Sequence, residues 1–169
     1  MVKLEIGGGV DIQKIHRLVR SDEVLVGYPD GVSHPDSAIQ NSDVARALHF
    51  GTAKIPARPF LYQAIASIRT ELQRKLREMY KRSVKEGKEP EGEYSLEGIG
   101  ALLVGAVQRF VRGDYFKSVT PNAPSTIAAK GSDTPLIDTG FMINSTTFVT
   151  KKVPPKTSER RMEVKGETP

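Results

Sequence analysis

The chain of 169 residues contains neither cysteine nor tryptophan. Without thiols, disulfide bonds, thiolate nucleophiles and cysteine-ligated zinc sites are excluded. The three histidines, His16, His34 and His49, stand far apart, and no two of them share a helical metal-ligand spacing. His34 and Asp36 could together contact a metal, but a loop histidine beside a proline is usually just exposed. We therefore expect no metal and no cofactor.

Long apolar runs are missing as well. The longest candidate, residues 99–107, is interrupted by Gly100 and Gly105, and it falls well short of the roughly 20 residues that cross a membrane. The opening residues 1–5 lack the charged-then-apolar layout of a signal peptide. We expect a protein that is made in the cytosol and has no membrane contact.

The chain also lacks a strong excess of charge of either sign. The 25 basic and 20 acidic residues leave a net charge of +5, which permits contact with nucleic acid or an acidic partner but is typical of an ordinary mixed-charge surface. Hydrophobic residues make up 38% of the chain and charged residues 27%. This composition favours one globular domain with polar extensions over a disordered chain.

The first third of the chain predicts short elements. Residues 2–6 alternate like a strand, and residues 11–20 have helical spacing. Residues 23–28 predict a strand that ends at a Pro-Asp-Gly turn. Ser42 is a suitable N-cap and Gly51 a suitable C-cap for a helix between them.

Two long amphipathic helices are expected next. Apolar residues recur every three or four positions from Leu61 to Met79 in a helix that should fade near Gly87, and again over residues 96–111. The short polar loop between the helices favours an antiparallel pair. Glycines inside the second helix, at Gly98, Gly100 and Gly105, predict close packing against a neighbour.

The remaining segments complete the expected architecture. Residues 146–153 are β-branched and aromatic enough for a strand, and residues 154–169 form a polar arm with little to bury. The predicted fold class is α+β, a small antiparallel sheet packed by two long amphipathic helices, with extended loops and a C-terminal arm. We expect one domain over residues 1–153, followed by the arm.

The strongest enzyme signal is residues 136–140, Leu-Ile-Asp-Thr-Gly. An apolar pair followed by Asp-Thr-Gly is typical of aspartic proteases, in which two carboxylates share a proton and activate water. That chemistry requires a β-rich fold, whereas only 29 residues follow Gly140 and the preceding chain is largely helical. The alternative is that Asp138 or Thr139 caps a short helix starting at Phe141.

A basic stretch on the first long helix is the best candidate for nucleic acid. Acidic residues interrupt it and can form helical ion pairs, so a solvated helix surface is the alternative. The residues that could face DNA in a channel, or an acidic partner, are Arg74, Lys75, Lys81, Arg82 and Lys85.

Two segments together resemble a known family. Residues 44–61 read VARALHFGTAKIPARPFL, and residues 120–131 read TPNAPSTIAAKG and lead to PLIDTG at 135–140. In this order and at these distances they are similar to the minor tail-component and virion-morphogenesis proteins of long-tailed bacteriophages, the neck or tail-completion proteins. The resemblance covers roughly residues 24–153.

The resemblance implies a structural, non-enzymatic virion protein. Such subunits form rings, commonly hexamers, at the head-proximal end of the tail. They complete the tail and join it to the head connector around the DNA channel. The implied partners are further copies of the chain, the connector or stopper, the tail terminator, the tail tube and the DNA that passes through, with no small-molecule substrate. The implied location is the virion, and the host cytoplasm during assembly. A tail terminator or a head-side stopper in the same neck remains an alternative.

Stiff proline segments suit contacts between subunits, because they lose little conformational entropy on docking. Arg58, between Pro56 and Pro59, either anchors a partner or braces its own loop. Phe50 and Phe60 are expected in the core. The residues expected to touch partners are Lys54, Ile55, Pro56, Ala57, Arg58, Pro59, Pro121, Asn122, Pro124, Ser125, Pro154 and Pro155.

Overall fold

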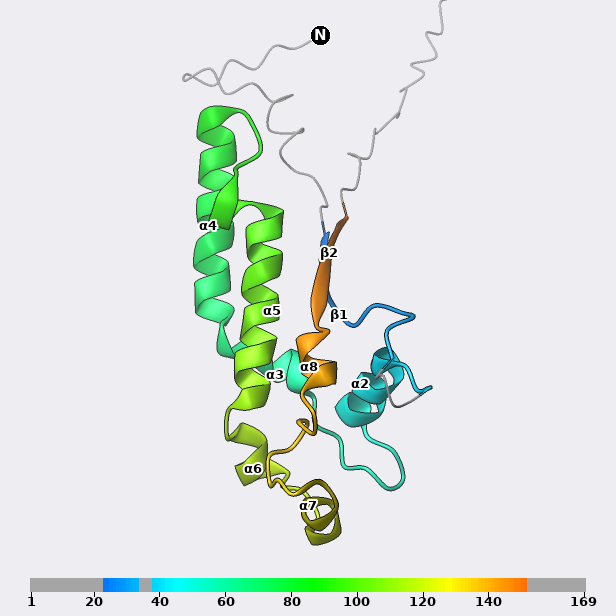
Figure 1. Cartoon of the computed structure of the whole chain (residues 1–169). Coiled ribbons are helices and arrows are strands. Elements are labelled where there is room, and N and C mark those ends of the chain that lie inside the picture. Colours follow the sequence, from blue (N-terminus) through cyan, green and yellow to red (C-terminus); the bar gives the residue numbers. More distant parts are fainter. Residues whose placement is uncertain (1–22, 34–37, 152–169) are drawn as a thin grey trace, which may run out of the picture.

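A computed structural model describes residues 23–33 and 38–151 (Figure 1). The strand expected at residues 2–6, the helix at 11–20 and the arm at 154–169, with Pro154 and Pro155, lie outside the described residues. The elements, in chain order, are β1 (Glu23–Gly27), α2 (Asn41–Phe50), α3 (Phe60–Ser67), α4 (Arg69–Glu86), the 3₁₀ turn η1 (Gly92–Tyr94), α5 (Leu96–Arg112), α6 (Tyr115–Val119), α7 (Pro124–Lys130), α8 (Phe141–Asn144) and β2 (Thr147–Lys151).

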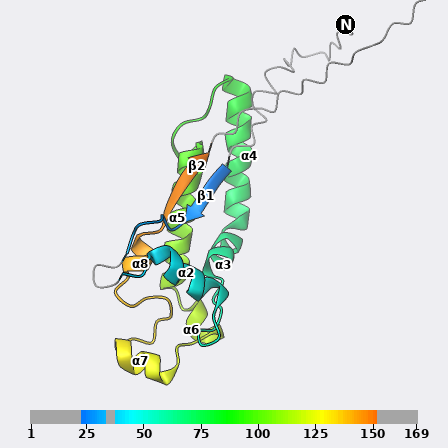
Figure 2. The ribbon, with the colours of Figure 1, turned by 90° about the vertical axis from the view of Figure 1, so that its right-hand side faces the viewer.

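The predicted α+β fold class is confirmed. β1 and β2 form an antiparallel pair in which Glu23 lies opposite Lys151 and Gly27 opposite Thr147. The pair runs beside α5, and α4 lies antiparallel to α5 on the side away from the sheet (Figure 1). The molecule is elongated, with the tip of α4 at one end and α7 at the other (Figure 2).

α5 is the centre of the packing. It contacts both strands and also α3, α4, α6 and α8. Its buried face carries Ile99, Leu103, Val107 and Val111 at helical spacing. The main core also takes in residues from α2, α3, α6 and α8: Ala45, Phe60, Ala64, Phe116 and Ile143.

Two glycines let neighbours approach α5, as predicted. A Cβ at Gly100 would lie 2.2 Å from the Phe148 ring of β2, and a Cβ at Gly98 would lie 2.3 Å from the carbonyl oxygen of Gly92. Gly105 has no such neighbour, because the nearest atom is the flexible end of Arg109 at 3.2 Å. The close packing therefore joins α5 to the sheet and to η1.

The first long helix is not continuous as predicted. It ends at Ser67, and α4 begins at Arg69 after Ile68, whose ψ of 11° departs from helical geometry. The Ser67 hydroxyl donates a hydrogen bond to the Ala64 carbonyl oxygen at 2.7 Å, a back-bond that often bends helices. The break gives α3 and α4 different directions (Figure 1). The residues of the predicted apolar face are half-buried on both sides of the break.

The predicted ends of α2 are half right. Gly51 is the C-cap, with a φ of 77°, and a Cβ there would lie 2.8 Å from the Ala57 nitrogen, so only glycine fits without strain. Ser42 lies inside the helix, and Gln40 is the N-cap without a side-chain bond. Phe60 is fully buried, but the core role expected for Phe50 is wrong, because its side chain is 66% exposed.

Candidate interaction groove

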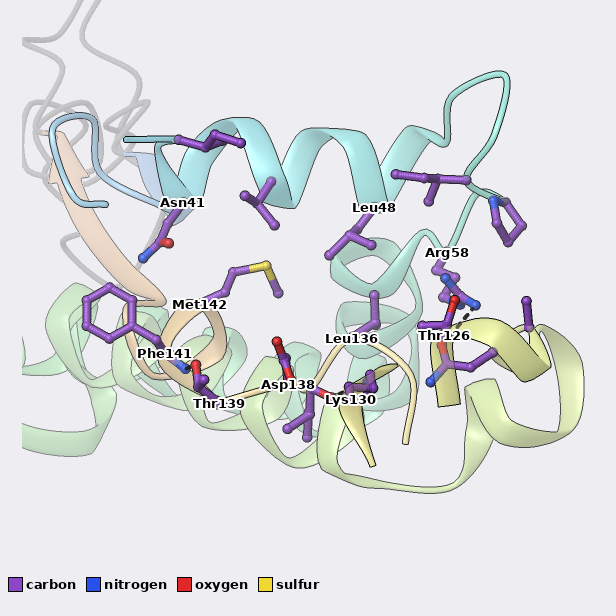
Figure 3. Close-up of a pocket in the computed structure, with 18 of the residues that line it drawn as sticks. Asn41, Leu48, Arg58, Thr126, Lys130, Leu136, Asp138, Thr139, Phe141 and Met142 are labelled. Carbon is purple, nitrogen blue, oxygen red and sulfur yellow. Dashed lines mark hydrogen bonds between the residues drawn. The ribbon is translucent and has the colours of Figure 1, made fainter. Parts of the chain in front are cut away.

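A groove of about 730 Å³ lies where residues 44–61 meet residues 120–140, the two segments that carry the family resemblance (Figure 3). One wall is α2 with the proline turn that follows it, residues 52–59. The other wall is α7 with the loop that leads to α8 and the first residues of α8. Leu48 and Met142 point into it from opposite walls (Figure 3). The lining is mainly apolar, with polar groups at a few points. The residues that line the groove are Ile39, Asn41, Val44, Leu48, Lys54, Ile55, Pro56, Arg58, Pro121, Asn122, Ala123, Thr126, Lys130, Leu136, Ile137, Asp138, Thr139, Gly140, Phe141 and Met142.

Arg58 ties the two segments together. Its Nε donates to the Thr120 carbonyl oxygen at 2.9 Å, and a terminal nitrogen donates to the Pro121 carbonyl oxygen at 3.0 Å and to Asn122 Oδ1 at 3.4 Å. The residue is only 5% exposed, and burial lowers the pKa of Arg58 below its ordinary value. Of the two roles left open by the sequence, the structure shows the brace, because the planar guanidinium is occupied by its own chain.

The proline turn is also held locally. The Thr52 hydroxyl accepts hydrogen bonds from the backbone N–H groups of Lys54, at 3.2 Å, and Ile55, at 3.1 Å. The Thr52 N–H donates to the Ile55 carbonyl oxygen at 2.8 Å. The Arg58 N–H donates to the Leu48 carbonyl oxygen at 2.9 Å. These bonds present the side chains of Lys54 and Ile55 at one rim of the groove.

Lys130 organises the opposite wall. Its ammonium group donates to the carbonyl oxygens of Thr134, at 2.7 Å, and Ile137. Burial lowers the pKa of Lys130, and the nearby Asp138 carboxylate partly offsets this shift. Leu136, inside the loop that Lys130 closes, has a φ of 65°, a conformation that costs a bulky residue on the order of 1–3 kcal/mol.

The Asp-Thr-Gly step leads into α8. Thr139 Oγ1 accepts a hydrogen bond from the Phe141 N–H at 3.3 Å, but the N-cap of α8 is Gly140, with a φ of 80° and no side-chain cap bond. The capping role expected for Asp138 or Thr139 is therefore wrong. Asp138 is exposed on this loop and points into the groove (Figure 3). The protease fold requires a β-rich surrounding, whereas the described residues around Asp138 are loops and short helices.

The structure brings together six of the ten expected contact residues that it describes. Lys54, Ile55, Pro56, Arg58, Pro121 and Asn122 line the groove, whereas Ala57, Pro59, Pro124 and Ser125 do not. Pro124 and Ser125 form the first turn of α7 and are exposed. Sequence reasoning missed Asn41, Lys130 and Met142, because only the tertiary contact gives these residues a shared surface.

The basic face predicted on α4 is smaller than expected. Lys75 is a correction, because it is buried and pairs with Glu93 at 2.6 Å. Arg82 lies over the Tyr94 ring at 3.8 Å, and Lys81 pairs with Glu78 at 2.8 Å. Arg74, Lys81, Arg82 and Lys85 are exposed and remain available to an anionic partner.

A second hollow of about 220 Å³ lies beside α2 and the end of β1. His49 is 4% exposed there, and its ring meets those of Phe50, Phe60 and Tyr62 edge-on at 4.7–5.3 Å. Its Nδ1 has no hydrogen-bond partner within the described residues. Burial lowers the pKa of His49, so the neutral form is favoured.

Across residues 23–33 and 38–151, no group of three or more histidine or acidic side chains is placed to hold a metal, and no helix is long and apolar enough to cross a membrane. No family model matches the chain, and no curated protein or solved structure matches it.

Proposed function

We propose that this chain is a structural protein of a long-tailed phage virion. In this role it forms a ring at the head-proximal end of the tail, completes the tail and joins it to the head connector around the DNA channel. Virion contacts and ring formation require surfaces that bind other proteins, and no step of this role requires a catalysed chemical reaction.

The observation that carries the proposal is the groove. The two segments that carry the resemblance, 44–61 and 120–140, lie far apart in the sequence and form its facing walls. Arg58 and Lys130 are used internally, on carbonyl and amide oxygens, to hold those walls. A rigid, mainly apolar groove with short proline-stiffened rims suits docking of a protein segment, because little entropy is lost on binding.

Exposed apolar side chains give further support. Ten large hydrophobic residues of the described chain are substantially exposed, and seven of these are at least half exposed: Leu25, Ile39, Phe50, Tyr62, Val84, Val119 and Val149. Single exposed residues of this kind are ordinary, but neighbouring ones favour burial in an assembly.

Electron microscopy of particles assembled without this protein tests the proposal. We expect DNA-filled heads and separate, otherwise complete tails, and addition of the purified chain should restore joining. Intact infectious virions formed without the protein would refute the proposal. Tails of uncontrolled length would favour the tail terminator, and emptied heads would favour the head-side stopper.

The Asp138→Asn variant separates the structural role from a protease. A virion subunit with this change should still join heads to tails, because Asp138 is exposed and the amide is nearly isosteric with the carboxylate. An aspartic protease would lose its cleavage activity. Failed joining together with uncleaved virion precursors would favour the protease.

A further inference from the structure

Within residues 23–33 and 38–151, no third strand pairs with either long edge of the sheet. β1 and β2 hydrogen-bond to each other, and no backbone hydrogen bond joins either strand to another part of the described chain. An unpaired edge presents a row of N–H and C=O groups to strands of other chains, and natural proteins usually block it with proline, a bulge or an inward charge. Neither strand, EVLVG or TFVTK, has a proline, and their charges stand only at one end.

The outer face of this sheet is apolar at its centre. Leu25 is 56% exposed and Val149 is 61% exposed, and the two residues lie directly opposite each other. The inner face, with Phe148, packs on α5. α5 therefore stabilises the inner face, whereas the outer apolar centre at Leu25 and Val149 is left to solvent in the single copy.

We propose that β1 of one copy pairs antiparallel with β2 of the next copy, so that neighbouring subunits share a continuous sheet. This inference rests on the proposed ring, and it identifies the surface through which the copies associate. Pairing of β1 with β2 is heterologous, so it uses both edges of every copy and can close into a ring. Pairing of β1 with β1 would leave every β2 edge open.

The backbone permits the same register between copies as within one. In an antiparallel pair, residues directly opposite alternate between hydrogen-bonded and non-hydrogen-bonded pairs. In a non-hydrogen-bonded pair, the β1 residue directs its backbone N–H and C=O to the free edge of β1. The β2 residue opposite it directs its own N–H and C=O to the free edge of β2. When the register is repeated between copies, the outward groups of β1 therefore meet the outward groups of β2.

The side chains match in this register too. Leu25 of one copy meets Val149 of the next, and the Glu23 carboxylate meets the Lys151 ammonium group. Cross-strand apolar pairs and opposite charges both stabilise a sheet. A β1–β1 pair centred on Leu25 would instead place Glu23 opposite Gly27 and provide no charge partner.

Cysteine cross-linking tests the pairing directly, because the chain has no native cysteine. Leu25→Cys and Val149→Cys are made in separate full-length chains, purified, mixed under conditions of subunit exchange and oxidised. We expect a disulfide-linked dimer in the mixture, with a Leu25–Val149 linkage by mass spectrometry, and none in either variant alone. Leu25→Cys mixed with Lys151→Cys is the register control, which should cross-link much less because the cysteines are two residues out of step.

Light scattering of the same samples separates the two proposals. An oligomeric chain with no Leu25–Val149 linkage, or with Leu25→Cys linked to itself, overturns the shared sheet and leaves the virion role intact. A chain that stays monomeric at every concentration overturns the shared sheet too, whereas the virion role is judged independently by particles that lack the protein.

A charge variant provides a second readout. Leu25→Lys should weaken self-association at least tenfold without unfolding the protein, because the side chain is exposed in the single copy. Val119→Lys is the matched control, because Val119 is 60% exposed on α6 and away from the sheet. Equal loss of association in both variants would contradict the proposed edge contact.

Discussion

Replacement of Arg58 tests whether the groove depends on a single brace. Arg58→Ala removes the donors to Thr120, Pro121 and Asn122 and also the buried stem of the side chain. A hydrogen bond from a charged group contributes about 1.5–3 kcal/mol when buried, and less where solvent shares the acceptor. Pro121 is exposed and the bond to Asn122 is long, so we expect a total loss of about 2–4 kcal/mol in the free energy of unfolding.

Arg58→Lys gives an intermediate case. An ammonium group is a point charge that cannot satisfy two carbonyl groups with the fixed fork of a guanidinium. We expect this variant to lose about 1–2 kcal/mol. Arg74→Ala is the control for removal of an arginine, because Arg74 is exposed on α4, and it should change stability by no more than about 0.5 kcal/mol.

Urea unfolding at one fixed protein concentration measures these differences, since association would otherwise shift the midpoint. At about 2–4 °C per kcal/mol for a chain of this size, Arg58→Ala should lower Tm by about 4–16 °C. Hydrogen exchange should also lose protection first at the amide of Ile127 in α7 and at that of its C-cap Gly131. An Arg58→Ala variant within about 0.5 kcal/mol of the parent, with α7 exchange unchanged, would refute the brace.

Three further predictions concern packing and pH. Gly100→Ala should cost about 1–3 kcal/mol, because its Cβ meets the Phe148 ring, whereas Gly105→Ala should stabilise α5 by up to about 1 kcal/mol; equal effects in thermal unfolding would contradict this account. Gly51→Ala should cost about 2 kcal/mol or more, since its φ is positive and the added Cβ meets backbone; a neutral result in urea would count against the observed turn. Folding lowers the pKa of His49 from its ordinary value of 6.5, so around and below pH 6.5 the unfolded chain binds more protons than the folded chain. Stability should therefore fall as the pH drops from about 7 to 5, and His49→Phe should flatten that slope; a parallel slope in the variant would exclude His49 as the cause.

Much of the fold follows from local sequence signals. The 3.6-residue spacing predicted α5, and Gly87 ends α4 as expected. The positions of β1 and β2 follow from β-branched residues beside a turn signal, although a strand pattern does not name its partner. The break at Ile68 was missed because the apolar period continues through it, and only the Ser67 back-bond and the packing of α3 on α5 reveal it.

The groove could be predicted only in part. Both proline-bearing segments were predicted to be contact elements, since their stiffness is a local property of the chain, and the structure places both of them at the groove. Their meeting was not visible, because Arg58 reaches carbonyl groups more than 60 positions away in the sequence. Lys75 was misplaced on a solvent face for the same reason, since its partner Glu93 is brought close by the return of the chain at η1.

The sequence by itself determined the elements that depend on near neighbours: helical faces, the Gly51 cap, the stiff turns and the absence of thiol chemistry. Tertiary structure alone decided which polar groups are used internally and which surfaces stay open. The physical reason is that burial and hydrogen-bond partners depend on distant residues, as in the guanidinium of Arg58 and in the edges of β1 and β2, which no other strand of the described chain covers.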